Sequence, residues 1–427
     1  MATQTFETNG VRIAVEGCGH GTLNAIYAAV AASCEARGWD GVDILIIGGD
    51  FQAARNAADL TVMSVPAKYR ELGDFWEYYA GHRTAPYLTV FAGGNHEAAS
   101  HMWELFYGGW AAPNIYYLGA ANVLRLGPLR IAGMSGIWKG FDYRKAHHER
   151  LPMGLDEIKS FYHVREVDVR KLLLLREQVD VGISHDWPRA IERWGDEKAL
   201  WRMKPDFERE SKDGTLGNVA AEYVNFLALD KCLPRRHFLQ LLEAHPHNVL
   251  PADQPSPTRP FRLQYDPEWL AITRVFHTSL KIGDPSAQPS PNLGEEHYVP
   301  LVDAERRWVE ENVVKKDRLD VPLNFEITAP PHVEGEPESV PHQPFEYTNP
   351  QTSAFCELLE VENLWDASEE ERMERKAKGP PAGEFRGHRG GEGVDEVDEV
   401  VEVVEDGVEG VEAEAKVGID INHVGFS

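Results

Sequence analysis

Apolar and polar positions follow two alternating patterns along the first half of the chain. Short continuous apolar runs, typical of strands that are buried on both faces, alternate with stretches in which apolar residues recur at helical spacing. The run at residues 11–17 precedes a predicted helix at 22–39. Further strands are predicted at 42–50, 85–97, 114–119 and 179–188. This strand-then-helix order predicts an α/β fold.

The remaining elements give the pattern a mixed α+β character. A hairpin is predicted at 122–136, turning at Gly127-Pro128, and a single helix at 158–178. After about Gly195 we predict strands at 226–232, 237–244 and 260–266 and helices at 264–280 and 301–316. Asp266 suits the N-cap of the first of these two helices, and Pro267 suits its first turn.

Charge is spread unevenly over the 427 residues. The net charge is −26, but residues 360–427 carry 20 acidic and 7 basic residues, a net of −13. The whole-chain sum therefore says little about a site elsewhere. From about Ala367 the sequence is acidic and of low complexity, which predicts a disordered tail.

The lack of targeting signals and the spacing of the cysteines favour an intracellular compartment. The first ten residues contain no apolar stretch of a secretory signal, and no apolar run approaches the ~18 to 20 residues that span a membrane. The four cysteines are scattered, without a C-x-x-C pair. This spacing indicates a reducing compartment, the cytosol or the nucleus.

Four short polar motifs follow apolar strands, where α/β sheets hold ligands. They are Cys18-Gly-His20, Gly-Gly-Asp50, Gly-Asn95-His96-Glu97 and Ser-His185-Asp186. Each motif alone suits a structural role, as a small buried cysteine, a helix cap, a loop residue or a core histidine. Together they supply thiol, imidazole, carboxylate and amide donors that can hold two divalent ions about 3.5 to 4 Å apart, with Asp50 bridging.

The order of these motifs resembles that of the metallophosphoesterase superfamily. In "GCGHG" a cysteine replaces the usual first aspartate of that superfamily. In this feature the chain resembles one member family, the RNA lariat debranching enzymes. The stretches "IIGGDFQAARNAADL", "GMSGIWKGFDYRKAHHERLP" and "YDPEWLAITR" are similar to that family as well. The resemblance covers residues 12–280, and more weakly extends to 362. It implies a four-layer αββα sandwich and hydrolysis of the 2′,5′-phosphodiester at the branch of excised intron lariats, and hence a nuclear protein.

The resemblance also implies roles for individual residues. Cys18, His20 and Asp50 match the ligands of one metal ion, and Asp50, Asn95 and His185 match those of the other. His96 matches the residue that stabilises or protonates the leaving 2′ oxygen. A thiolate ligand favours Fe²⁺ and Zn²⁺ over Mg²⁺, with Mn²⁺ as a further candidate. The implied domains are a catalytic domain at 11–244, a C-terminal domain at 245–362 and the acidic tail at 363–427.

Residues 134–152 resemble the loop with which the family contacts lariat RNA. The loop combines cations, which bind phosphates, with aromatic residues, which stack on unpaired bases. A solvated basic loop is the alternative interpretation. We predict RNA contacts from Lys139, Tyr143, Arg144, Lys145 and His148.

One part of the family pattern is missing. The superfamily has a further strand that ends in H-x-H and gives one histidine to each metal, which in this family precedes the stretch "FLALDKC". Here Val224 runs directly into Asn225, and no histidine lies between His185 and His237. The later His245-Pro-His247 has the wrong order and flanks. Three interpretations remain open: an active debranching enzyme, a protein that binds lariat RNA without efficient cleavage, and a general phosphoesterase.

Overall fold

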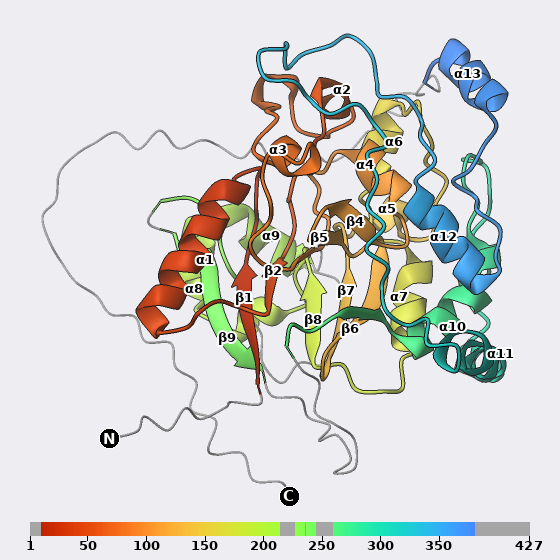
Figure 1. The fold of residues 1–427 in the computed structure, drawn as a ribbon, viewed down its shortest axis with the longest axis horizontal. Helices are drawn as coiled ribbons and strands as arrows, with labels where there is room; N and C mark the ends of the chain where they lie inside the picture. The colour runs from red at the N-terminus through yellow and green to blue at the C-terminus, as the bar shows by residue number, and fades with distance from the viewer. Residues whose placement is uncertain (1–9, 214–226, 235, 245–258, 381–427) are drawn as a thin grey trace, which may run out of the picture. The chain divides into compact units, whose positions relative to one another are not determined.

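The computed structural model describes residues 10–213, 227–234, 236–244 and 259–380 (Figure 1). The first of its two sheets has the order β4-β5-β3-β2-β1-β9. Strands β1, β2, β3 and β5 run parallel, while β4 and β9 are antiparallel to their neighbours. The bounds are β1 Val11–Glu16, β2 Ile44–Ile47, β3 Thr89–Phe91, β4 Gly109–Ala112, β5 Ile115–Tyr117 and β9 Leu239–Ala244.

The second sheet has the order β10-β6-β7-β8. The predicted hairpin forms β6 and β7 and turns at Gly127, whose φ of +55° is favourable for glycine. Strand β8 runs parallel to β7 and lies at the edge of this sheet among the described residues. The bounds are β6 Ala121–Leu126, β7 Leu129–Met134, β8 Val181–Ser184 and β10 Leu263–Tyr265.

Alternating residues of the first sheet bury its two faces in different clusters. Ile13 of β1 and Ile46 of β2 pack in one cluster with Ile131 of β7, so the two sheets pack face to face. The next residues along, such as Ala14 and Leu45, pack instead with helix α1. Helices α7 and α10 join the cluster of the second sheet and contact each other. This arrangement confirms the predicted αββα sandwich.

The helices connect the strands and extend the chain beyond the second sheet. Helix α10 has Asp266 as its N-cap, as predicted, and the Asp266 side chain accepts a hydrogen bond from Trp269 N. The bounds are α1 Leu23–Arg37, α2 Ala57–Leu60, α3 Phe75–Tyr79, α4 Ala99–Glu104, α5 Gly140–Tyr143, α6 Leu155–Ser160, α7 Glu166–Leu173, α8 Glu197–Met203, α9 Pro205–Asp213, α10 Pro267–Phe276, α11 Glu295–Val309, α12 Pro350–Leu359 and α13 Glu369–Lys378.

The helix predicted at 301–316 begins earlier, at Glu295, and ends at Val309 as α11. Two further predicted elements are interrupted or shortened in the structure. The single helix expected at 158–178 is interrupted between α6 and α7, because Tyr162 O and Val164 N hydrogen-bond the backbone of Ile137 instead of continuing a helix. The strand expected at 226–232 reduces, in its described part, to one bridge between Lys231 and Cys18. There Asp230 accepts a hydrogen bond from the next backbone N–H, which competes with strand pairing.

The C-terminal region belongs to the same compact unit as the first 244 residues. Strand β10 extends the second sheet through β6. From helix α12, the side-chain amide of Gln351 accepts from Trp110 N (2.7 Å) and donates to Trp110 O (2.9 Å). This amide therefore satisfies backbone groups of β4, which lies at the edge of the first sheet, in place of another strand.

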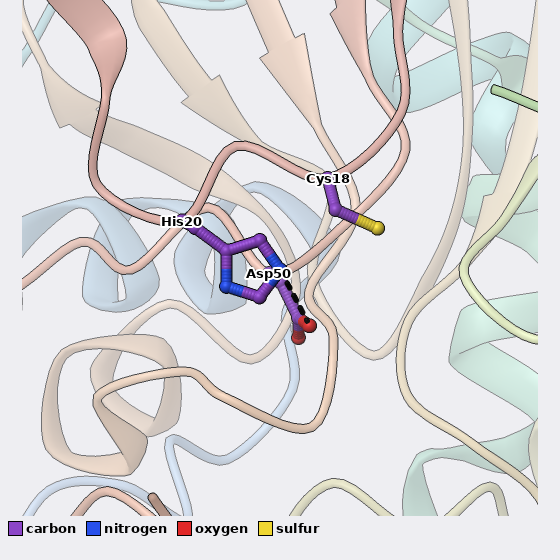
Figure 2. A group of neighbouring side chains, drawn as sticks. All are labelled: Cys18, His20 and Asp50. Carbon is purple, nitrogen blue, oxygen red and sulfur yellow. Dashed lines mark ion pairs between the residues drawn. The ribbon is translucent and has the colours of Figure 1, made fainter. Parts of the chain in front are cut away.

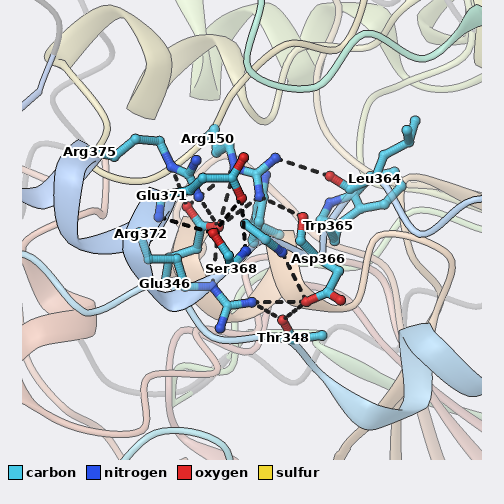
Figure 3. A network of polar contacts seen from close by, with 12 residues as sticks. Arg150, Glu346, Thr348, Leu364, Trp365, Asp366, Ser368, Glu371, Arg372 and Arg375 are labelled. Carbon is cyan, nitrogen blue, oxygen red and sulfur yellow. Dashed lines mark hydrogen bonds and ion pairs between the residues drawn. The ribbon is translucent and has the colours of Figure 1, made fainter.

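The prediction of a disordered acidic tail at 363–427 is wrong for residues 369–378, which form helix α13. Helix α13 begins with a capping box of Ser368 and Glu371. It is tied to the body through Glu346, which accepts hydrogen bonds from Arg150 Nη2 (2.8 Å) and Arg375 Nη2 (2.7 Å) (Figure 3). Local capping and ion pairs of half-buried arginines with the buried Glu346 therefore offset the polar composition of this stretch. The rest of the predicted tail lies outside the described residues.

None of the helices in the described ranges is both long enough and apolar enough to cross a bilayer.

Candidate metal centre

The four polar motifs meet where strands of both sheets end. Strands β1, β2 and β3 are neighbours in the first sheet and run parallel, so the loops that follow them lie at one edge. They carry Cys18 and His20, Asp50, and Asn95 with His96, respectively. Strand β8 of the second sheet brings His185 to the same place, 3.4 Å from the Asp50 carboxylate.

One group of donors consists of Cys18, His20 and Asp50 (Figure 2). Their ligand atoms all lie within 4.8 Å of one another, and the three residues are buried or half-buried. His20 Nε2 lies 3.6 Å from Asp50 Oδ2. A thiol, an imidazole and a carboxylate that converge in this way fit a divalent ion of intermediate softness.

A second group shares Asp50 with the first. His185 Nε2 lies 3.4 Å from Asp50 Oδ1 and 3.3 Å from Asn95 Oδ1. The other ring nitrogen, His185 Nδ1, lies 3.3 Å from Gly48 O, a contact that fixes the ring orientation when Nδ1 carries the proton. Asp50 is thus placed between two donor sets, as a bridging carboxylate has to be.

Two glycines are required for this close approach. A Cβ on Gly94 would lie 2.0 Å from Asp50 Oδ1, and a Cβ on Gly49 would lie 2.0 Å from His185 Nδ1. Gly49 also has a φ of +144°, which side-chain-bearing residues rarely adopt. The Gly-Gly pairs that precede Asp50 and Asn95 therefore provide the space in which the two donor sets meet.

Asp50 is held in its charged form despite being buried. Burial raises its pKa, but the imidazoles of His185, His96 and His20 more than compensate, so that the pKa falls to about 2. Burial, followed by the charge of Asp50, raises the pKa of the Cys18 thiol. A divalent ion held by Cys18 would favour the thiolate, so its binding would release a proton from Cys18.

Glu97 organises the loops from behind the site, a role that the motif did not reveal. Its carboxylate accepts hydrogen bonds from Phe51 N (2.7 Å), Gln52 N (2.8 Å) and Gly94 N (3.1 Å). Burial, and after it the charge of Asp50, raises the pKa of Glu97 to about 7. Glu97 therefore joins the loop after β2 to the loop after β3 and fixes Asp50 relative to Asn95.

Replacing Glu97 by alanine should destabilise the fold, because three backbone donors lose their acceptor. We expect Glu97→Ala to lower the free energy of unfolding by about 3 kcal/mol, and Glu97→Gln, which keeps part of the acceptor set, by about 1 kcal/mol. Urea denaturation measures both changes, with the exposed Glu71→Ala as control. A loss below about 1 kcal/mol in Glu97→Ala would contradict this organising role.

His96 lies beside the shared carboxylate. Its Nδ1 is 3.3 Å from Asp50 Oδ2, and its backbone N–H donates to Asp50 Oδ1 at 2.9 Å. The rings of His96 and His20 are 5.4 Å apart. His96 thus sits at the edge of the donor sets, and its predicted role toward the leaving oxygen stays a prediction.

The five residues predicted to contact RNA have different surroundings. Lys139 and Arg144 are exposed at the two ends of α5, and the exposed Lys145 lies 2.5 Å from Asp142. Tyr143 is half-buried against the core. His148 is half-buried as well, and its backbone carbonyl accepts from Gly283 N. The basic surface of this loop is therefore formed mainly by Lys139, Arg144 and Lys145.

The place where the H-x-H segment is missing lies outside the residues that the structure describes. Val224 and Asn225, between which the segment would lie, and the His245-Pro-His247 motif are all outside the described ranges. The structure therefore leaves the predictions about them as predictions.

Comparisons with known proteins agree with this architecture. A sequence model for calcineurin-like phosphoesterases matches residues 11–211, and one for the C-terminal domain of lariat debranching enzymes matches residues 221–364. The lariat debranching enzyme of Arabidopsis thaliana is 39% identical over 391 residues, covering 84% of this chain and 88% of the relative. That of Homo sapiens is 40% identical over 388 residues, covering 82% of this chain and 69% of the relative. That of Schizosaccharomyces pombe is 35% identical over 459 residues, covering 82% and 96%.

The relatives also contain residues that this chain lacks. Since 84% of 427 residues is about 359, about 32 of the 391 positions aligned with the Arabidopsis thaliana protein have no counterpart here.

Proposed function

Because the chain belongs to the lariat debranching enzyme family, we propose that it hydrolyses the 2′,5′-phosphodiester at the branch of excised intron lariat RNA. The observation that carries the proposal is the shared position of Asp50. Its carboxylate lies 3.3 to 3.6 Å from three imidazoles, with a cysteine thiol completing one donor set and the Asn95 amide completing the other.

The donor sets fit the two divalent ions of a metallophosphoesterase. Cys18, His20 and Asp50 would hold one ion, and Asp50, Asn95 and His185 the other. When bound, such ions lower the pKa of water to give a nucleophile and offset phosphate charge. The Cys18 thiolate favours Fe²⁺ and Zn²⁺, with Mn²⁺ as the weaker candidate.

The side chains around the donor sets supply the remaining steps. Because His96 Nδ1 faces the Asp50 carboxylate, Nε2 is the ring nitrogen left to donate a proton to the departing 2′ oxygen. The exposed cations Lys139 and Arg144 would bind phosphates on either side of the branch. Since introns are excised in the nucleus, we place the protein there.

Weak cleavage with retained RNA binding is a second candidate function. It is supported by the about 32 aligned positions that this chain lacks and by the absence of H-x-H between His185 and His237. Each ion then has three protein donors, enough for binding but fewer than the family pattern supplies. A general phosphoesterase is less favoured, because hydrolysis of small phosphate esters does not require the basic loop.

Cleavage of a synthetic branched RNA tests the proposal against both alternatives. We expect the chain, supplied with Fe²⁺, Zn²⁺ or Mn²⁺, to cleave the 2′,5′ linkage and to leave linear 3′,5′ RNA intact. A His96→Ala variant should cleave about 10² times more slowly at unchanged RNA affinity. Binding without any cleavage would favour the second candidate. Equal hydrolysis of branched RNA and p-nitrophenyl phosphate would favour the general phosphoesterase.

A further inference from the structure

The first residues of the basic loop are hydrogen-bonded to the loops of the metal centre. Gly136 N donates to Gly93 O (2.8 Å), and Gly93 N donates to Ser135 Oγ (2.8 Å). Gly93 immediately precedes Gly94, which makes the close approach to Asp50. The start of the RNA-binding loop and the loop that carries Asn95 and His96 are therefore joined directly.

Asp186 makes a second connection, from the other sheet. Its Oδ2 accepts from Trp138 N (2.9 Å), in the basic loop, and its Oδ1 accepts from Trp187 N (2.8 Å). Asp186 directly follows His185, which belongs to the second donor set. Both carboxylate oxygens are thus committed to backbone donors, so Asp186 links the metal centre to the loop while His185 supplies the donor atom.

Beyond this connection the loop is held firmly by buried polar groups. Asp142 in α5 lies 2.6 Å from His163 Nδ1, and its backbone carbonyl accepts from Arg165 Nη1 (3.0 Å). All three residues are buried. The exposed cations at the two ends of α5, Lys139 and Arg144, are therefore fixed to the residues around His163. The hydrogen bonds at Gly136 and Trp138 join this part of the loop to the metal centre.

We propose that Asp186 is a positioning residue that sets the orientation of the RNA-binding loop relative to the metal centre. The inference rests on the proposed function. A branched RNA that reaches both the loop and the metal centre gains affinity only if the two lie at a fixed spacing, because the second contact is then intramolecular. Linear RNA held by the loop alone gains nothing from that spacing.

The test compares the binding of branched and linear RNA by Asp186 variants. The branched probe carries a phosphorothioate at the 2′,5′ linkage, which slows its hydrolysis, and Mn²⁺ is supplied throughout. For Asp186→Ala we expect the Kd for branched RNA to rise about tenfold and the Kd for linear RNA to stay within about twofold. Asp186→Asn can keep only one of the two backbone hydrogen bonds, so its Kd for branched RNA should rise about threefold.

Asp180 provides a matched control at the opposite end of β8. Its carboxylate also accepts a backbone hydrogen bond, from Arg130 N (2.8 Å). Asp180→Ala should leave the preference for branched RNA unchanged. Amide hydrogen exchange gives a readout without RNA: exchange at residues 137–143 should accelerate in Asp186→Ala and stay unchanged in Asp180→Ala.

The outcomes separate this inference from the proposed function. A wild-type chain that binds branched and linear RNA equally would contradict the proposed function, and hydrogen exchange would then decide the link made by Asp186. If wild type prefers branched RNA and Asp186→Ala retains both that preference and the slow exchange, the positioning role is overturned. Equal losses in Asp186→Ala and Asp180→Ala would overturn it too, since they would reflect general destabilisation.

Discussion

Inserting a strand that carries His-x-His between Val224 and Asn225 should increase the single-turnover rate of branched-RNA cleavage by about 100-fold or more. Each donor set now contains three protein donors. The insertion would add one imidazole to each set. A metal ion that lacks one of its ligands is held loosely. A displacement of the reacting groups by about 1 Å reduces the rate by about 100-fold.

The second sheet has a place for such a strand. Strand β8 carries His185 to the centre, and it is the edge strand among the described residues of this sheet. A strand that pairs with its outer side would deliver side chains next to His185 and would satisfy backbone groups of the edge. The inserted chain is therefore expected to be more stable as well as faster.

The matched control is the same insertion with Ala-x-Ala in place of His-x-His. It should restore the stability gained from pairing but not the rate, because it adds no donor. Rapid-quench assays with Mn²⁺ supplied would compare the original chain with the two insertions. Equal rates for all three would show that other groups complete the centre in the chain as it stands.

Replacing Asp50 by alanine should remove bound metal from both donor sets and reduce cleavage at least about 10³-fold. Asp50 is the only residue common to the two sets in the described part of the chain, and its charge is stabilised by three imidazoles. Asn95→Ala should remove metal mainly from the set that contains His185, because Asn95 lies only in that set.

Elemental analysis after gel filtration distinguishes the two variants. We expect Asp50→Ala to retain well under half of the metal bound by wild type, and Asn95→Ala to retain about half. Asp59→Asn is an unsuitable control because Asp59 pairs with the buried Arg55. The exposed Asp40→Asn is suitable. Retention of both ions by Asp50→Ala would contradict a shared carboxylate.

Much of the fold could be predicted because strand and helix periodicity are local properties. The apolar run at 42–50 ends in Gly-Gly-Asp50, and parallel strands bring such ends to one edge whatever the details of packing. The five predicted metal-binding residues are accordingly adjacent in the structure. Their adjacency fits the predicted ligand sets, although the roles of the individual residues stay predictions.

The features that the sequence did not reveal depend on contacts between distant segments. The break between α6 and α7 arises from hydrogen bonds with Ile137, and α13 is tied to the body by Glu346. Neither Ile137 nor Glu346 lies within the stretch of sequence whose structure it determines. The link between Asp186 and Trp138 is of the same kind, since two residues 48 positions apart cannot be paired by a local pattern.

Anomalous X-ray scattering from crystals grown with Zn²⁺ tests the metal centre most directly. The account predicts two ions: one bound by Cys18 Sγ, His20 and Asp50, and the other by Asp50, Asn95 Oδ1 and His185. The occupancy of both should be reduced in crystals of Asp50→Ala. A single ion bound elsewhere, or two ions that do not share Asp50, would contradict the account.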